Sequence, residues 1–233
     1  METKLQKLDA RLSACVAYLI PGRTVADVGC DHGKLTAHLA QKGFFVIGTD
    51  INKKPLEVAK STCSAMGCME QVSLRLGDGL QPLQPLEAEQ IVIAGVSAET
   101  ILHILDDAGW IRTQGIRLVL CPATKIPLLR QGLCRRGFFV LDETPVVVSG
   151  RCYTVICAEY TGEIWEPTQE FCLIGKTATK PFASELRDDT AIKLEKQLRG
   201  MAKESDEYKQ AKELLEWLRQ LPLPQAQHEE QEQ

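Results

Sequence analysis

The sequence has no excess of positive charge. Its 233 residues include 27 Lys and Arg against 31 Asp and Glu, which gives a formal net charge of −4. A chain with this balance has no general attraction to nucleic acid. The charge is uneven, however, because residues 1–160 hold 17 basic and 16 acidic side chains, whereas residues 161–233 hold 10 and 15. Any contact with RNA must therefore be a local basic patch in the first part of the chain.

Metal-binding and membrane-spanning patterns are missing as well. None of the nine cysteines forms a Cys-x-x-Cys pair, and the nearest pairs, Cys63/Cys68 and Cys152/Cys157, lack zinc-finger spacing. We expect reduced thiols of the cytosolic kind and no metal site. The start of the chain has no apolar signal core, and no apolar run approaches the length of a membrane span. These absences predict a cytoplasmic protein without a membrane partner.

The sequence also lacks the G-x-G-x-x-G fingerprint of dinucleotide-binding proteins, although it has a related turn. Residues 24–36 read Thr-Val-Ala-Asp-Val-Gly-Cys-Asp-His-Gly-Lys-Leu-Thr. The apolar run 25–28 predicts a buried strand, and the apolar spacing after the turn predicts a helix. Gly29 and Gly33 have no Cβ, so a ligand can approach the backbone closely there. A strand, a turn and a helix in this order open a nucleotide-binding βαβ unit.

Acidic side chains in this turn indicate the kind of ligand. Asp27 and Asp31 would repel the pyrophosphate that dinucleotides place at such a helix start, but they suit a cation. S-adenosylmethionine carries an ammonium and a sulfonium group and no phosphate, so the turn points to this cofactor. An ordinary strand–turn–helix with acidic caps is the alternative. Asp50 ends the next apolar run, 19 residues after Asp31. This is close to the spacing at which an acid meets a ribose, although Asp50 could also cap the following helix.

Two further strand ends bring polar groups to the same edge. The alternating run 72–76 predicts the third strand, and Asp78 and Gly79 follow it. A carboxylate there is placed to receive the exocyclic amine of an adenine, although an Asp-Gly turn is common for its own sake. The fourth strand, residues 90–95, ends at Ala94 and Gly95, where open α/β sheets place their ligands.

The order of elements predicts an α/β fold. Five strand–helix units are followed by two apolar stretches within residues 137–160, which leave no room for a crossover helix. Ser149-Gly150 is therefore expected to turn an antiparallel hairpin. This is the arrangement of class I methyltransferases, which have a Rossmann-like sheet with a terminal hairpin. An amphipathic helix is predicted to precede the sheet, over residues 3–20.

The C-terminal part is predicted to be helical. Two stretches, 183–202 and 205–221, carry apolar stripes, and we expect an antiparallel, coiled-coil-like helical hairpin. The stripe of the first helix consists of Ile192, Leu194, Leu198 and Met201. The polar tail, residues 225–233, is expected to fray. The predicted domains are a methyltransferase domain, residues 1–161, and a helical hairpin domain, residues 162–233.

Together these residues resemble the bacterial tRNA adenine-N1 methyltransferase family, which modifies adenine-22 of certain tRNAs. The string Asp-x-Gly-x-Asp-His at residues 27–32 is the most specific part of the likeness. The likeness covers nearly the whole chain. It includes Arg11-Leu12 in the leading helix, the loop 26–32, Asp78–Leu80, Ile91–Gly95, the Cys121-Pro122 strand end, Tyr153 in the hairpin and the helical tail.

The resemblance implies an enzyme that uses S-adenosylmethionine to methylate N1 of an unpaired or flipped adenine in tRNA. The cofactor site would consist of Asp27, Gly29, Cys30, Asp31, His32, Asp50, Ile51, Asp78, Gly79, Ala94 and Gly95. Asp31 is the candidate catalytic residue, because a carboxylate would stabilise the charge that develops on the base. Binding the ammonium group of the cofactor is its alternative role. Arg11, Lys34 and Arg151 are candidates for contacts with tRNA phosphates. We expect a monomer, with association through the C-terminal helices as the alternative.

Three places differ from the family pattern, and all line the edge where a target base would enter. Residues 32–36 read His-Gly-Lys-Leu-Thr instead of His-Ala-Tyr-Leu-Pro, so Lys34 stands in place of a tyrosine. Residues 96–98 read Val-Ser-Ala instead of Met-Gly-Gly, and residues 121–123 read Cys-Pro-Ala instead of Gln-Pro-Asn. Three alternatives therefore stay open: a methyltransferase acting on another RNA, a small molecule or a protein; a homologue with reduced activity; and a binding protein without this chemistry.

Overall fold

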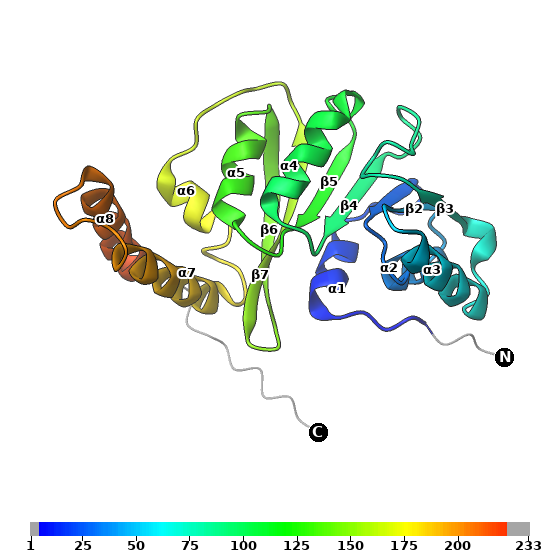
Figure 1. Ribbon diagram of the computed structural model, residues 1–233, viewed down its shortest axis with the longest axis horizontal. Helices are drawn as coiled ribbons and strands as arrows, with labels where there is room; N and C mark the ends of the chain where they lie inside the picture. Colours follow the sequence, from blue (N-terminus) through cyan, green and yellow to red (C-terminus); the bar gives the residue numbers. More distant parts are fainter. Residues whose placement is uncertain (1–4, 223–233) are drawn as a thin grey trace.

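The computed structural model describes residues 5–222, which contain one seven-stranded sheet. Its strands lie in the order β3-β2-β1-β4-β5-β7-β6, so the order reverses between β1 and β4 (Figure 1). The strands are β1 Val25–Val28, β2 Val46–Asp50, β3 Val72–Leu76, β4 Gln90–Ala94, β5 Arg117–Cys121, β6 Phe138–Val148 and β7 Arg151–Tyr160. The first five are parallel, and β7 pairs antiparallel with both β5 and β6. The predicted α/β sheet with a terminal hairpin is confirmed.

Helices cover both faces of this sheet. They are α1 Ala10–Ala17, α2 Lys34–Gln41, α3 Lys53–Ala65, α4 Ala98–Asp107 and α5 Ile126–Cys134, with short 3₁₀ helices at Met69–Gln71 (η1) and Gly109–Ile111 (η2). Side chains alternate between the two faces along each strand. Val25 and Val92 therefore pack with α1 and α2, whereas Ile91 and Leu118 pack with α4 and α5. The strands are apolar on both faces because both faces are covered.

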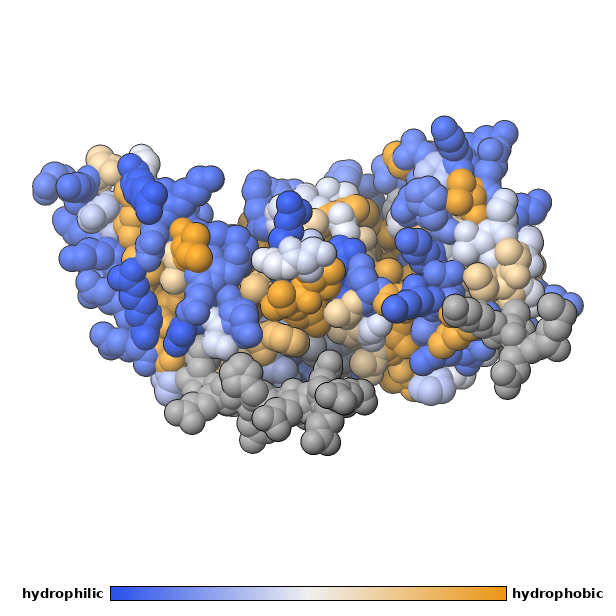
Figure 2. All heavy atoms as spheres, turned by 90° about the horizontal axis from the view of Figure 1, so that it is seen from below, coloured by the Kyte–Doolittle hydropathy of each residue, from blue (hydrophilic) through white to orange (hydrophobic). Residues whose placement is uncertain are grey.

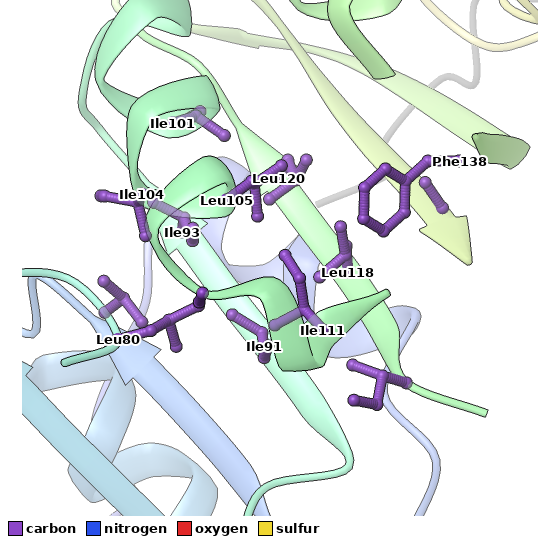
Figure 3. Packing of buried hydrophobic residues seen from close by; sticks show 14 of the residues in the cluster. Leu80, Ile91, Ile93, Ile101, Ile104, Leu105, Ile111, Leu118, Leu120 and Phe138 are labelled. Carbon is purple, nitrogen blue, oxygen red and sulfur yellow. The ribbon is translucent and has the colours of Figure 1, made fainter. Parts of the chain in front are cut away.

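The larger core lies between the sheet and α4. Ile101 and Leu105 of α4 pack against strand residues such as Leu120 (Figure 3), and they share one face of the helix because they lie four residues apart. Ser97 caps the helix by accepting a hydrogen bond from the N–H of Thr100 (3.2 Å). This packing fixes the start of α4 beside the carboxyl end of β4.

The leading helix is shorter than the prediction over residues 3–20. It begins at Ala10, because the Asp9 side chain accepts a hydrogen bond from the N–H of Leu12 (3.1 Å) and caps the helix there. The preceding described residues are not helical. Gln6 is held against α2 instead, with its N–H donating to Oε1 of Gln41 (2.8 Å). The apolar spacing predicted the type of element correctly but placed its start too early and its end too late, since α1 ends at Ala17.

The C-terminal helices extend beyond the edge strand β6 (Figure 1). They are α6 Gln169–Ile174, α7 Ala183–Leu198 and α8 Asp206–Gln220. Leu194 and Leu215 join α7 to α8, so the predicted pair of helices is present, and hydrophilic side chains cover most of its outer surface (Figure 2). The predicted stripe was wrong at Ile192, which is 65% exposed, because α7 turns its Leu194 face to α8. The coiled-coil character and the domain boundary at residue 161 stay predictions, and the tail 225–233 lies outside the described residues.

A buried ion pair ties the last turn of α6 and the segment after it to the sheet. Arg130 of α5 and Glu143 of β6 are fully buried, with 2.7 Å between Nε and Oε1. The Arg130 guanidinium also donates to the carbonyls of Cys172 and Leu173 (2.7 and 2.8 Å). Glu143 in turn accepts a hydrogen bond from the N–H of Lys176. The chain that leads to α7 and α8 is therefore held by side chains of the sheet layer.

Candidate functional site

The turn after β1 contains two glycines and one strained aspartate. Gly29 and Gly33 have φ of 74° and 72°, and Asp31 between them has φ of 47°. These are left-handed conformations that favour glycine. The N–H groups of Gly29 and Cys30 donate to the carbonyl of Thr49 at 2.8 and 2.9 Å, so the turn bends over the end of β2. A non-glycine residue held in this region is the kind of outlier that occurs at functional sites.

Asp31 presents its carboxylate to solvent at this turn. The side chain is 68% exposed, and its Oδ2 lies 2.7 Å from Nδ1 of His32. This contact is an ion pair when the imidazole is protonated. The hydroxyl of Thr62 donates to the carbonyl of His32 (2.9 Å), which fixes the backbone of the turn against α3. The charge of Asp31 is thus available to a ligand, while its backbone is fixed.

Asp50 is held at the end of β2 by two backbone groups. Its Oδ2 accepts a hydrogen bond from the N–H of Asp31 (3.2 Å) and its Oδ1 accepts one from the N–H of Asn52 (2.8 Å). A carboxylate has about four lone-pair sites, so two remain for a ligand such as a pair of ribose hydroxyls. Asn52 occupies the N-cap position of α3 and makes no side-chain cap hydrogen bond. Asp50 is therefore not the N-cap residue of α3. Its carboxylate fixes the backbone at Asp31 and Asn52 instead.

Asp27 lies beneath the turn and is nearly inaccessible. It is 5% exposed, and the hydroxyl of Thr36 donates to its Oδ2 (2.6 Å). Burial raises the pKa of Asp27 to about 6, although the Thr36 hydrogen bond acts in the opposite direction. Burial likewise raises the pKa of the neighbouring Cys30 thiol, so this cysteine stays protonated. Cys30 is therefore a packing residue whose contribution to the turn comes from its backbone.

The third and fourth strands complete the same edge. The hydroxyl of Thr49 donates to the carbonyl of Gly79 (2.9 Å), and the N–H of Gly77 donates to the carbonyl of Asp50 (3.0 Å). These bonds bring Asp78 beside the end of β2. After β4, Gly95 has φ of 87° and donates its N–H to the carbonyl of Cys121 at 2.9 Å. The four strand ends thus meet around one hollow.

This hollow is a cleft of about 640 Å³. All eleven residues predicted to bind a cofactor line it, namely Asp27, Gly29, Cys30, Asp31, His32, Asp50, Ile51, Asp78, Gly79, Ala94 and Gly95. Arg11 and Lys34, two of the three predicted RNA contacts, line it too. Arg151 does not line the cleft; it is exposed at the hairpin turn, where β7 begins. Its role as an RNA contact stays a prediction that the cleft does not support.

Several lining residues were not selected from the sequence. They are Asp9, Leu12, Leu35, Thr49, Asn52, Thr100 and Ile104 among others. Thr49 and Asn52 flank Asp50, so the strand-end rule could have found them. Asp9 had no such signal, because it belongs to the segment before α1, and only the fold brings that segment to the cleft.

Two of the three segments that differ from the family pattern, residues 96–98 and 121–123, are joined to each other. The N–H of Ala123 donates to the carbonyl of Val96 (2.8 Å), and the N–H of Ala98 donates to the carbonyl of Thr124 (3.3 Å). Ser97 and Thr124 form a parallel bridge between them. Substitutions in either segment therefore alter the same surface. Val96 is the residue of that surface that lines the cleft.

Comparison with known proteins assigns this geometry to a family. A family model described as a methyltransferase domain matches residues 8–156. The chain belongs to the methyltransferase-domain family. The match spans β1 to β5, the cleft and most of the hairpin, and the resemblance stated from the sequence is confirmed at this level.

Curated relatives of this methyltransferase include enzymes with different substrates. The tRNA (adenine(22)-N(1))-methyltransferase of Bacillus subtilis (strain 168) is 33% identical over 155 residues, which cover 66% of this chain and 65% of that protein. Demethylmenaquinone methyltransferase of Tropheryma whipplei (strain Twist) is 30% identical over 120 residues, which cover 50% of this chain and 49% of that protein. The chain thus aligns with less than two thirds of the length of either relative.

Solved structures extend the likeness to the C-terminal helices. The crystal structure of the B. subtilis m1A22 tRNA methyltransferase TrmK has a TM-score of 0.74 and 27% identity, covering 93% of this chain and 99% of that one. The structure of M. capricolum TrmK in complex with S-adenosyl-homocysteine has a TM-score of 0.76 and 21% identity, covering 91% and 96%. At 21% identity the second comparison supports the fold alone.

Proposed function

We propose that this methyltransferase transfers the methyl group of S-adenosylmethionine to N1 of an adenine in tRNA, at position 22. The observation that carries the proposal is the row of carboxylates at strand ends around one cleft, which suits a cationic nucleoside without phosphate. The choice of tRNA is supported by the extent of the likeness. The B. subtilis tRNA enzyme aligns with 66% of the chain in sequence and 93% in structure, whereas the quinone-modifying relative aligns with 50% of the chain in sequence.

The residues that line the cleft fit the cofactor part by part. The exposed Asp31 and the buried Asp27 lie around the turn that would receive the methionine part, whose ammonium group is cationic. Asp50 has lone pairs left for the two ribose hydroxyls. Asp78 would accept a hydrogen bond from the exocyclic amine of adenine, beside Gly79, whose backbone has φ of 52°.

Catalysis would rest on positioning and charge. When bound, S-adenosylmethionine supplies an electrophilic methyl group on a sulfonium centre. The cleft holds the acceptor in line with that group and excludes water, which lowers the barrier by orientation. N1 of adenine attacks as a neutral lone pair and becomes cationic, so the exposed carboxylate of Asp31 can stabilise the developing charge. Binding the cofactor ammonium is the other role open to Asp31.

The proposal includes tRNA as the partner and the cytoplasm as the compartment. A base paired in a helix cannot reach a cleft at a sheet edge, so the tRNA would present an unpaired or flipped adenine. All nine cysteines are free thiols, in keeping with action in the reducing cytoplasm. Within residues 5–222, the helices are all too short or too polar to cross a bilayer. The monomeric state stays a prediction.

The direct test is methyl transfer to tRNA by the purified protein. Unmodified total tRNA is incubated with labelled S-adenosylmethionine. The tRNA is then digested to nucleosides, which are identified by mass spectrometry. We expect N1-methyladenosine with the wild type and at least a roughly tenfold slower reaction with Asp31→Asn, because the variant loses the charge. Asn tolerates the left-handed conformation, so the melting temperature should be unchanged.

Transfer to no tRNA would refute the proposed substrate. The altered wall at Val96 and Ala123 makes a small-molecule acceptor the second candidate. Labelling of a small-molecule extract without labelling of RNA would support that candidate instead.

A further inference from the structure

The cleft has a second group of lining residues, apart from the eleven assigned to the cofactor. Asp9, Arg11 and Leu12 reach it from the start of α1. Nη2 of Arg11 lies 2.7 Å from Oδ2 of Asp9. The centre of the same guanidinium lies 4.8 Å from the centroid of the Tyr153 ring. Arg11 is therefore held by an acid at its end and by an aromatic ring on its face.

This arrangement presents a planar cation to the cleft. The Arg11 side chain is 27% exposed, and its Nε is buried without a hydrogen-bond partner among the described residues. A guanidinium has two faces on which planar groups can stack, and the partly exposed Arg11 lines the cleft. Unpaired bases in RNA are commonly stacked on aromatic rings or on guanidinium planes. A purine is thus the kind of group that this surface suits, more than a phosphate, which would need the edge that Asp9 occupies.

The ion pair matters because the acceptor changes charge. A neutral adenine becomes cationic when N1 is methylated, so an unpaired arginine beside it would oppose the reaction. Asp9 neutralises that arginine. Burial works against ionisation of Asp9, but the hydrogen bonds from Arg11 and Leu12 hold its pKa below the usual range. The pair therefore keeps both charges at neutral pH and presents no net charge to the base.

We propose that Arg11 is the stacking platform for the acceptor adenine and that Asp9 keeps this platform electrically neutral during methyl transfer. The proposal rests on the proposed function, since it concerns the acceptor side of the same cleft. It assigns to Arg11 a contact with the base in place of the phosphate contact expected from the sequence.

The test of stacking is Arg11→Lys, which keeps the positive charge and removes the plane. We expect KM for tRNA to rise by on the order of tenfold, because removal of a side chain that stacks on a base typically weakens binding on this scale. Affinity for S-adenosylmethionine, measured by calorimetry, should stay the same. Arg135→Lys is the matched control, since Arg135 pairs with Glu166 on the surface and does not line the cleft. The control should leave KM unchanged.

The test of neutrality is Asp9→Asn. Asn caps helices as well as Asp does, so α1 should remain capped while Arg11 loses its counter-charge. We expect kcat to fall by on the order of tenfold, with little change in KM and an unchanged melting temperature. A residue that only stabilised α1 would not separate kcat from KM in this way.

A fluorescence measurement reports the stack without chemistry. The probe is a tRNA transcript with 2-aminopurine at position 22, added to protein saturated with S-adenosylhomocysteine. We expect quenching with the wild type and Arg135→Lys, and a clear loss of quenching with Arg11→Lys. Equal quenching and equal KM for Arg11→Lys would overturn the inference and leave the proposed function intact. Absence of methyl transfer by the wild type would overturn both.

Discussion

At the scale of single residues, three aspartates on one rim have three different environments. Asp27 is buried against Thr36, Asp50 accepts two backbone N–H groups, and Asp31 is exposed in a strained turn. An aspartate carboxylate can therefore have a different role at each of the three positions. Burial raises the pKa of Asp27 to about 6, whereas Asp31 presents its carboxylate where a ligand can reach it.

Asp27 makes the stability of the ligand-free protein depend on pH. Its pKa is about 6 in the folded chain, against an ordinary value of 3.8 that also holds for the unfolded chain, so the folded state binds the proton more tightly. The resulting stability is fully present below pH 3.8 and is lost as the pH rises through 6. Between about pH 5 and pH 8 the free energy of unfolding should fall by about 1.4 kcal/mol relative to Asp27→Asn.

Urea unfolding of both proteins across this range measures the effect. Thr36→Val should shift the pH at which this stability is lost to a higher value, because the hydroxyl that lowers the pKa of Asp27 is removed. A constant difference between wild type and Asp27→Asn at every pH would show that Asp27 does not titrate in this window.

At the scale of elements, the turn depends on close packing between α2 and α3. A Cβ added to Gly33 would lie 2.8 Å from the Cα and Cβ of Ala59, closer than such atoms approach. Gly33 also has φ of 72°. Its lack of a side chain therefore serves both the turn and the contact between the helices, which places the turn over the end of β2.

Gly33→Ala should destabilise the protein by about 3 kcal/mol, since overpacking adds to an unfavourable backbone conformation. Gly43→Ala is the matched control. Gly43 has φ of 85° but nothing within 4 Å of an added Cβ, so it should cost only about 1 kcal/mol. Chemical denaturation compares the two, and equal losses would mean that the contact with Ala59 contributes nothing.

The strands and helices differ in how well the sequence predicts them. Continuous apolar runs predicted the buried strands, because a parallel sheet covered on both faces needs them, and Ser149-Gly150 predicted the hairpin. Apolar spacing could not place the start of α1, since the Asp9 cap decides it. It also could not show that Ile192 faces solvent, or that Asp9 reaches the cleft, because both depend on contacts between distant segments.

At the scale of the whole molecule, one buried junction holds the C-terminal helices to the sheet. Arg130 binds the backbone of the last turn of α6 and Glu143 binds the backbone of the segment after it, where Gly175 leaves no room for a side chain beside Glu143. A buried ion pair is costly to break from one side, because the remaining charge is left without a partner. The position of α7 and α8 therefore depends on both side chains.

Arg130→Met should lower the free energy of unfolding by about 3–5 kcal/mol. The double variant Arg130→Met/Glu143→Leu should be clearly more stable than this single variant, because it leaves no buried charge. Urea unfolding of the wild type, both single variants and the double variant gives the coupling energy. A double variant with the summed losses of the two single variants would contradict the account.

The central claim is that the rim of strand-end acids binds a positively charged nucleoside without phosphate. Titration calorimetry of the full chain tests it most directly, with S-adenosylmethionine and the dinucleotide NAD as the two ligands. The account predicts saturable binding heat for S-adenosylmethionine and none for NAD. No heat with S-adenosylmethionine, or comparable binding of the pyrophosphate-containing dinucleotide, would contradict it.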